Sequence, residues 1–109
     1  MQVTVKPWGK EEILETNEHY TVKRIWMNKG CQCSLQKHSE KKETFVLIEG
    51  LMQFTHNGKT RTLHAGKFAT IEPGEVHRMA AMTNIVYLEC STSQLDDVVR
   101  LSDLYGRVE

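Results

Sequence analysis

The chain has 109 residues, 39% of them apolar, and its 14 basic and 14 acidic side chains give a formal net charge of zero. This length fits one globular domain without a second, nucleotide-binding one, and the balanced charge argues against nucleic acid as a partner. No apolar run approaches the roughly 20 residues that span a bilayer, and the first ten residues carry charges without the apolar stretch of a secretion signal. We therefore expect a cytoplasmic protein with no membrane partner.

Short β-like runs separated by turn residues make up most of the chain, which is the pattern of a β-sandwich or barrel. The expected strands cover residues 20–27, 31–37, 44–48, 51–56, 59–63, 68–71, 76–81 and 85–90, after a short first strand that ends at Pro7-Trp8-Gly9. Asn57-Gly58 between two of these runs is a strong hairpin signal. The run 44–48 is apolar on both faces, so we expect it in the centre of a sheet. Trp26 and Phe54 are expected to fill the barrel.

The tail differs from the rest of the chain and predicts a short C-terminal helix packed on the outside of the barrel. Residues 91–93 offer N-cap side chains, and Asp96 and Asp97 suit the positive end of the helix dipole. The apolar residues on one face of such a helix are Leu95, Val98, Val99 and Leu101.

The three cysteines are Cys31, Cys33 and Cys90. An odd number of cysteines without a secretion signal indicates reduced thiols. Cys31 and Cys33 would share one face of a strand, where their spacing does not suit a disulfide bond. We interpret them as small buried side chains rather than as metal ligands or redox groups.

Four polar residues on three expected strands predict a metal site. Gln36 and His38 alternate on one strand and therefore share a face. Glu43 begins the next strand after a short turn, and His77 comes from a later strand. Two imidazoles, a carboxylate and an amide oxygen would bind a small cation and leave positions open for water or substrate. Such mixed ligands suit several divalent ions, namely zinc, manganese, nickel, cobalt or iron.

The spacing around these residues resembles the two sequence motifs of the cupins, which are small double-stranded β-helix barrels with a metal ion at the mouth. Five residues separate Gly30 from Gln36, four separate His38 from Glu43, and six separate Glu43 from Gly50, as in the first motif. Gln36 stands where that motif has its first histidine.

The second motif covers residues 66–81, in which Gly66, Gly74 and His77 keep the cupin register and Ala81 replaces the usual asparagine. The resemblance implies an all-β fold, with one cupin domain over residues 1–109 and the first motif at residues 30–50. It also implies a homodimer. A small barrel whose central strands are apolar on both faces gains a cover from a second subunit.

Among cupins, the chain resembles the cupin domain of type II phosphomannose isomerases, which is often fused to a mannose-1-phosphate guanylyltransferase. Lys6-Pro7-Trp8-Gly9 is similar to the Arg-Pro-Trp-Gly that opens that domain, and residues 20–26, 34–38, 95–100 and 103–107 resemble its later segments. The family continues with His-His-His-Arg-Ala-Glu-His-Trp, where this chain has residues 38–45. Of that pattern the first histidine and Glu43 are retained, and Lys41 stands in place of the arginine.

The resemblance implies a metal-dependent aldose–ketose isomerase that acts on a small polar ligand such as a sugar phosphate. Glu40 and Lys41 are the nearby candidates for the proton-transfer and phosphate-binding roles. The departures over residues 38–45 favour an alternative, a non-catalytic cupin that binds a metal and a small molecule as a sensor or accessory protein. A third reading is an oxygen-using cupin, since two histidines and one glutamate suffice to bind iron.

Overall fold

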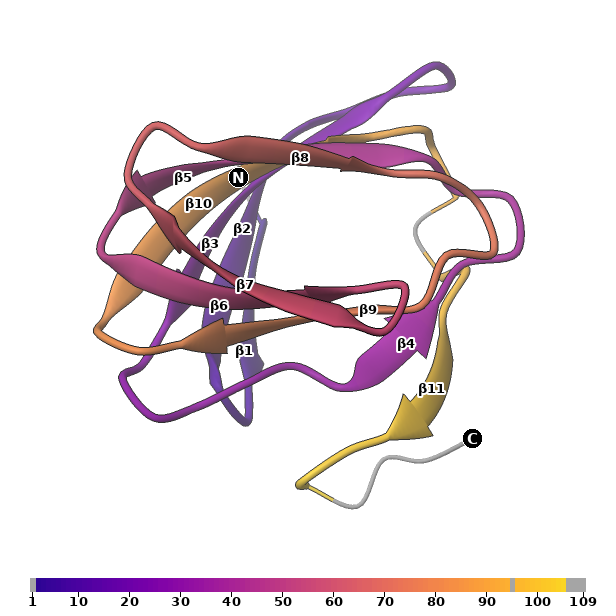
Figure 1. Cartoon of the computed structure of the whole chain (residues 1–109). Coiled ribbons are helices and arrows are strands. Elements are labelled where there is room, and N and C mark those ends of the chain that lie inside the picture. The colour runs from indigo at the N-terminus through magenta and orange to yellow at the C-terminus, as the bar shows by residue number, and fades with distance from the viewer. Residues whose placement is uncertain (1, 95, 106–109) are drawn as a thin grey trace.

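The computed structural model describes residues 2–94 and 96–105. Within these residues the chain forms eleven strands and no helix, so the all-β prediction is confirmed. The strands form two antiparallel sheets that face each other and enclose the core (Figure 1). The six-stranded sheet has the order β1 (Gln2–Lys6), β2 (Gly9–Thr16), β3 (Thr21–Met27), β10 (Ile85–Ser91), β5 (Glu43–Glu49) and β8 (Phe68–Ile71). The five-stranded sheet has the order β11 (Val99–Ser102), β4 (Leu35–Lys37), β9 (His77–Ala81), β6 (Leu51–His56) and β7 (Lys59–His64).

Alternating burial along the central strands separates an inward face from an outward face, as period-two side chains require. The inward face changes character along the barrel. On β10, Ile85 and Tyr87 are apolar and the next inward residue is Glu89. Lys23 on β3 lies directly opposite Glu89, and Glu43 on β5 lies opposite the following inward position of β10. One end of the barrel is therefore an apolar core, and the other end is lined with charged side chains.

Aromatic rings fill the apolar end. Phe45 and Phe54 are fully buried and meet edge to face with their ring centroids 5.0 Å apart, and Tyr87 lies 5.8 Å from Phe45. Such edge-to-face contacts are favoured by the ring quadrupoles. Phe54 thus fills the barrel as expected.

Two turns show why particular residues are needed. The Asn57-Gly58 hairpin between β6 and β7 is confirmed, and both residues have positive φ, as a type I′ turn requires. At the β1–β2 turn, a Cβ on Gly9 would overlap the backbone oxygen of Trp26. A side chain at position 9 would therefore push the β1–β2 hairpin away from β3.

The C-terminal helix predicted over the tail is wrong for the described residues. Val99–Ser102 forms β11, which pairs with β4, and Leu95 lies outside the described residues. The carboxylate of Asp97 accepts hydrogen bonds from the backbone N–H groups of residues 39–41, at 2.7 to 2.9 Å. Asp97 thus caps a turn far away in sequence instead of a helix start, and the open edge of β4 supplies the tail with backbone partners.

Trp26 does not fill the barrel, so that prediction is wrong. It lies on the outward face of β3, half-buried, where the Lys10 ammonium sits 4.6 Å from its ring centroid.

The strand expected at residues 31–37 is shorter, since only Leu35–Lys37 is extended and paired. All three cysteines are free: Cys33 is buried, Cys31 is half-buried and Cys90 is exposed. The part of the chain that the structure describes contains no helix with the length and apolar composition needed to cross a membrane.

Candidate metal centre

Three of the four predicted ligands meet at the charged end of the barrel. His38 follows β4, Glu43 begins β5 and His77 begins β9. Their ligand atoms all lie within 4.8 Å of one another, and each of the three residues is at most 3% exposed. The two imidazole rings are 5.0 Å apart, centroid to centroid.

The other nitrogen of each imidazole is held by a backbone carbonyl. Nδ1 of His38 bonds the carbonyl oxygen of Asp97, and Nδ1 of His77 bonds that of Glu75 at 3.1 Å. A carbonyl oxygen only accepts hydrogen bonds, so the tautomer with the proton on Nδ1 satisfies this contact and directs the Nε2 lone pair of each ring into the site. Backbone carbonyls commonly orient metal-binding histidines in this way.

Both Nε2 atoms point at one carboxylate oxygen. Oε1 of Glu43 lies 2.9 Å from Nε2 of His38 and 3.2 Å from Nε2 of His77. His77 Nε2 is buried and makes no hydrogen bond of acceptable geometry, despite that short distance. With the protons on Nδ1, the two Nε2 lone pairs and the Glu43 carboxylate repel one another unless a proton or a metal ion lies among them. The donor set, two imidazole nitrogens and a carboxylate oxygen, fits a divalent metal ion.

The carboxylate of Glu43 stays ionised at this position. Burial alone would raise its pKa, but hydrogen bonds from His38 and His77, whose Nε2 atoms donate when they carry a proton, and the charge of Lys41 hold the pKa well below its usual value. An ionised carboxylate beside two neutral imidazoles is the form that binds a metal without first losing a proton.

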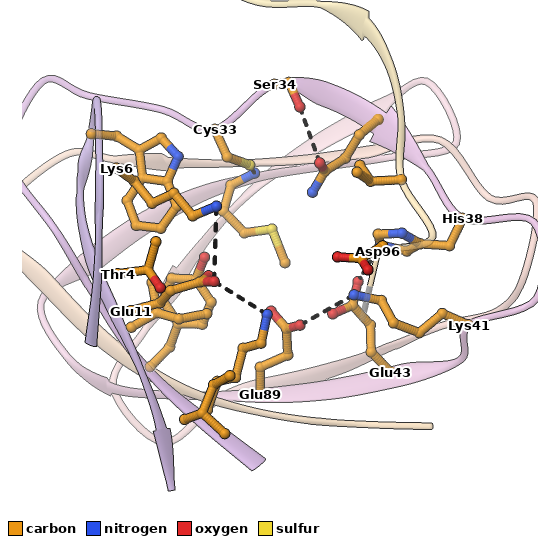
Figure 2. Close-up of a pocket in the computed structure, with 18 of the residues that line it drawn as sticks. Thr4, Lys6, Glu11, Cys33, Ser34, His38, Lys41, Glu43, Glu89 and Asp96 are labelled. Atoms are coloured by element: carbon orange, nitrogen blue, oxygen red, sulfur yellow. Dashed lines mark hydrogen bonds and ion pairs between the residues drawn. The ribbon is translucent and has the colours of Figure 1, made fainter. Parts of the chain in front are cut away.

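Gln36, the fourth predicted ligand, lies in β4 directly opposite His77 in the β4–β9 ladder. Its amide oxygen accepts a hydrogen bond from the Ser34 hydroxyl at 3.0 Å (Figure 2). Gln36 is half-buried and lines the same cavity as His38 and Glu43. Its role as a ligand stays a prediction.

A cavity of roughly 500 Å³ opens in front of Gln36, His38 and Glu43, and His77 is not among its lining residues. This volume lies in the range of small-molecule binding pockets. Basic and acidic side chains occur in equal number in its lining: Lys6, Lys23, Lys41 and Arg100, and Glu11, Glu43, Glu89 and Asp96. The cavity therefore suits a polar ligand.

The two residues predicted for proton transfer and phosphate binding lie in different surroundings. Lys41 is 6% exposed and lines the cavity, and its Nζ is 3.7 Å from Oε1 of Glu89. Glu40 is exposed and is not among the residues that line the cavity. Burial and the nearby charge of Glu43 raise the pKa of Glu89 well above its usual value.

Sequence reasoning missed Glu89, Glu11 and Lys23 as cavity residues. A signal for Glu89 was present, because it is a lone carboxylate in the apolar run 85–90, on the same face as Ile85 and Tyr87. A charged residue on the buried face of a strand needs a partner or a function.

Comparison with known proteins decides the family. The family model described as "Mannose-6-phosphate isomerase C-terminal" matches residues 1–103. The chain belongs to this family.

Its relatives include larger enzymes. The chain is 33% identical to the mannose-1-phosphate guanylyltransferase ManC of Salmonella typhimurium over 108 residues, and 33% identical to the alginate biosynthesis protein AlgA of Pseudomonas aeruginosa over 107. Each match covers 94% of this chain and 22% of the relative. The chain therefore spans about a fifth of the length of these curated relatives.

Solved structures confirm the cupin fold. KdgF from Halomonas superposes with a TM-score of 0.81 at 13% identity, over 88% of this chain and 89% of that one. An RmlC-like cupin from Shewanella frigidimarina superposes with a TM-score of 0.78 at 20% identity, over 87% and 88% of the two chains. At these identities the likeness extends to the fold alone.

Proposed function

We propose that the chain is a metal-dependent aldose–ketose isomerase of a sugar phosphate, with mannose 6-phosphate as the substrate to test first. The observation that carries the proposal is the convergence of the two imidazole Nε2 atoms on the Glu43 carboxylate beside a cavity lined with charged groups. Family membership supports the choice of substrate, since the matching family is described as the C-terminal part of mannose-6-phosphate isomerase.

His38, Glu43 and His77 would hold the metal ion, with Gln36 as the nearest further ligand. When bound, a divalent ion supplies positive charge that stabilises the negative charge developing on the oxygens of the open-chain sugar. The carbonyls of Glu75 and Asp97 keep both imidazoles oriented during turnover.

Isomerisation moves a proton between two neighbouring sugar carbons, so it needs a base that faces the substrate. Glu89 is the carboxylate best placed for this step, because it lines the cavity next to the metal-binding residues and is ion-paired with Lys41. Lys41 would hold the Glu89 side chain and place a positive charge beside the substrate. Glu40 is a weaker candidate for the proton transfer, since its side chain is exposed outside the cavity lining.

A cupin that binds a metal and a small molecule without catalysis is the second candidate. The departure of residues 38–45 from the histidine-rich pattern of the isomerases favours it. Both candidates need the metal, so metal binding and turnover must be measured separately.

The test is a coupled assay for fructose 6-phosphate formed from mannose 6-phosphate after restoring zinc, manganese, cobalt or nickel. Elemental analysis of the same samples gives the metal content. We expect metal and turnover in the wild type, loss of both in His77→Ala, and no change in His19→Ala, which removes an exposed histidine. Metal without turnover in the wild type would refute the isomerase and favour the binding protein. Equal metal content in His77→Ala and wild type would refute the metal centre.

A further inference from the structure

The β1–β2 hairpin forms a second charged wall of the cavity, on the side opposite the metal-binding residues. Figure 2 shows Lys6 and Glu11 on one side of the cavity and His38 and Glu43 on the other. Lys6 comes from β1, and Glu11 comes from β2. Neither residue belongs to a cupin motif or takes part in the metal centre.

Two lysines share one carboxylate at this wall. The ammonium of Lys23 lies 3.3 Å from Oε1 of Glu11, and the ammonium of Lys6 lies 3.9 Å from the same oxygen (Figure 2). Lys23 also stands opposite Glu89 in the β3–β10 ladder, but Glu89 already pairs with Lys41. Lys6 and Lys23, with Glu11 between them, therefore carry more positive than negative charge at this wall.

Burial makes this imbalance of charge costly. Lys23 is 9% exposed, and it is the charged residue on the inward face of β3, between Thr21 and Ile25. An ammonium group withdrawn from water needs a full set of anionic partners, and one shared carboxylate oxygen supplies only part of it. An anionic ligand that enters the cavity would complete the set.

The position of this wall fits the geometry of the proposed substrate. In an open-chain hexose 6-phosphate, the phosphate is at the far end of the carbon chain from the two carbons that exchange a proton. If the reacting end lies at His38, Glu43 and His77, the phosphate has to lie away from them. A phosphate dianion accepts charge-assisted hydrogen bonds from ammonium groups, which are about twice as strong as neutral ones.

We propose that Lys6 and Lys23 form an anion subsite that holds the phosphate of the ligand, and that Glu11 keeps both ammonium groups in place when the subsite is empty. This inference rests on the proposed function for its assignment to a sugar phosphate. The subsite makes the enzyme selective for the phosphorylated sugar over the free sugar.

The test compares mannitol 1-phosphate with mannitol as ligands of the metal-loaded chain, by isothermal titration calorimetry. Neither compound has a carbonyl group, so neither can isomerise, and their difference in affinity reports the phosphate contribution. The variants are Lys23→Met and Lys6→Met, in which methionine keeps the apolar stem and removes the charge. Lys10→Met is the matched control, because Lys10 lies on the same hairpin with its ammonium over the Trp26 ring on the outward face.

We expect the wild type and Lys10→Met to prefer the phosphorylated compound equally. Lys23→Met and Lys6→Met should each lose about tenfold in affinity for it, the loss expected for one hydrogen bond to a charged group. Their affinity for mannitol should not change, and Lys23→Arg should retain the preference. Lys6 is more exposed than Lys23, so Lys6→Met tests the subsite even where Lys23→Met fails to fold.

The outcomes separate the two proposals. Lysine-dependent phosphate binding without turnover of mannose 6-phosphate would refute the isomerase and leave the subsite standing. Turnover together with unchanged phosphate affinity in both lysine variants would leave the isomerase standing and refute the subsite. In an active enzyme, the lysine variants should raise KM for mannose 6-phosphate with little change in kcat, because the phosphate does not react.

Discussion

Replacing Glu43 by glutamine tests whether the cluster at the barrel mouth is built for a metal ion or for its own stability. The carboxylate faces two imidazole Nε2 atoms, at 2.9 and 3.2 Å. A glutamine amide has nearly the same shape and can donate a hydrogen bond to either Nε2 atom. In the metal-free chain, we therefore expect Glu43→Gln to be at least as stable as the wild type.

Adding metal should reverse that order. A ligand present at a hundred times its dissociation constant stabilises the native state by about 2.7 kcal/mol. For a domain of this size, this free energy raises Tm by roughly 10 °C. Glu43→Gln lacks the anionic ligand, so most of that increase should disappear.

The assay is thermal unfolding followed by circular dichroism, with EDTA and with an excess of each divalent ion. Glu49→Gln, an exposed position on the same strand, is the control and should behave as the wild type. If Glu43→Gln lowers the stability of the metal-free chain by more than about 2 kcal/mol, Glu43 is a structural partner of charged histidines, as a broken buried pair would show. That result would refute the interpretation of the cluster as a metal site.

Three further predictions concern the scaffold. Hydrogen bonds from the Glu72 backbone, Asn57 and His56 lower the pKa of Glu75 from its ordinary 4.5 to about 2. Because the folded-state pKa is the lower one, Glu75 stabilises the fold above pH 4.5 and loses this effect as the pH falls towards 2. The difference in unfolding free energy between wild type and Glu75→Gln should shrink over that range, and a difference constant down to pH 3 would contradict this. Phe54→Ala should cost about 3–5 kcal/mol in urea unfolding, because it empties a fully buried site, whereas exposed Phe68→Ala should stay within about 0.5 kcal/mol. Light scattering should give twice the 12.6 kDa chain mass if the predicted homodimer forms, and a mass of 12.6 kDa would contradict it.

Local signals in the sequence predict the positions of most strands, but not their order in the two sheets. Alternating residues, the Asn57-Gly58 turn and the glycine-bounded segments marked nearly every strand because each depends on neighbours in sequence. The three residues of the candidate metal centre could also be predicted from the sequence, since the spacing of His38, Glu43 and His77 constrains where their strands can bring them.

The errors arise where both faces of a strand look alike. In β3, the outward face holds Val22, Arg24 and Trp26, and the inward face holds Lys23 and Ile25. Each face mixes charged and apolar side chains, so alternation could not tell which face carries the core. Alternation along the sequence therefore does not show that Trp26 lies outside the barrel and that Lys23 lines the cavity.

The tail has a helical pattern of apolar residues, but pairing with a strand that is distant in sequence makes it extended. The spacing of Val98 and Leu101 suits a helix, but the partner of this segment is β4, which lies more than 60 residues earlier in the chain. Local periodicity carries no information about a free strand edge elsewhere in the molecule.

The bond between the Asp97 carbonyl and His38 has a consequence for how the chain assembles. The same residue that fixes the orientation of His38 also anchors the tail through residues 39–41. Docking of the tail and orientation of His38 both depend on Asp97, so we expect them to be thermodynamically linked. Metal should protect the tail from proteases, and cleavage before Asp97 should weaken metal binding although it removes no ligand. The protease sensitivity of the tail would then report whether a metal is bound beside His38, which lies 59 residues before Asp97 in the chain.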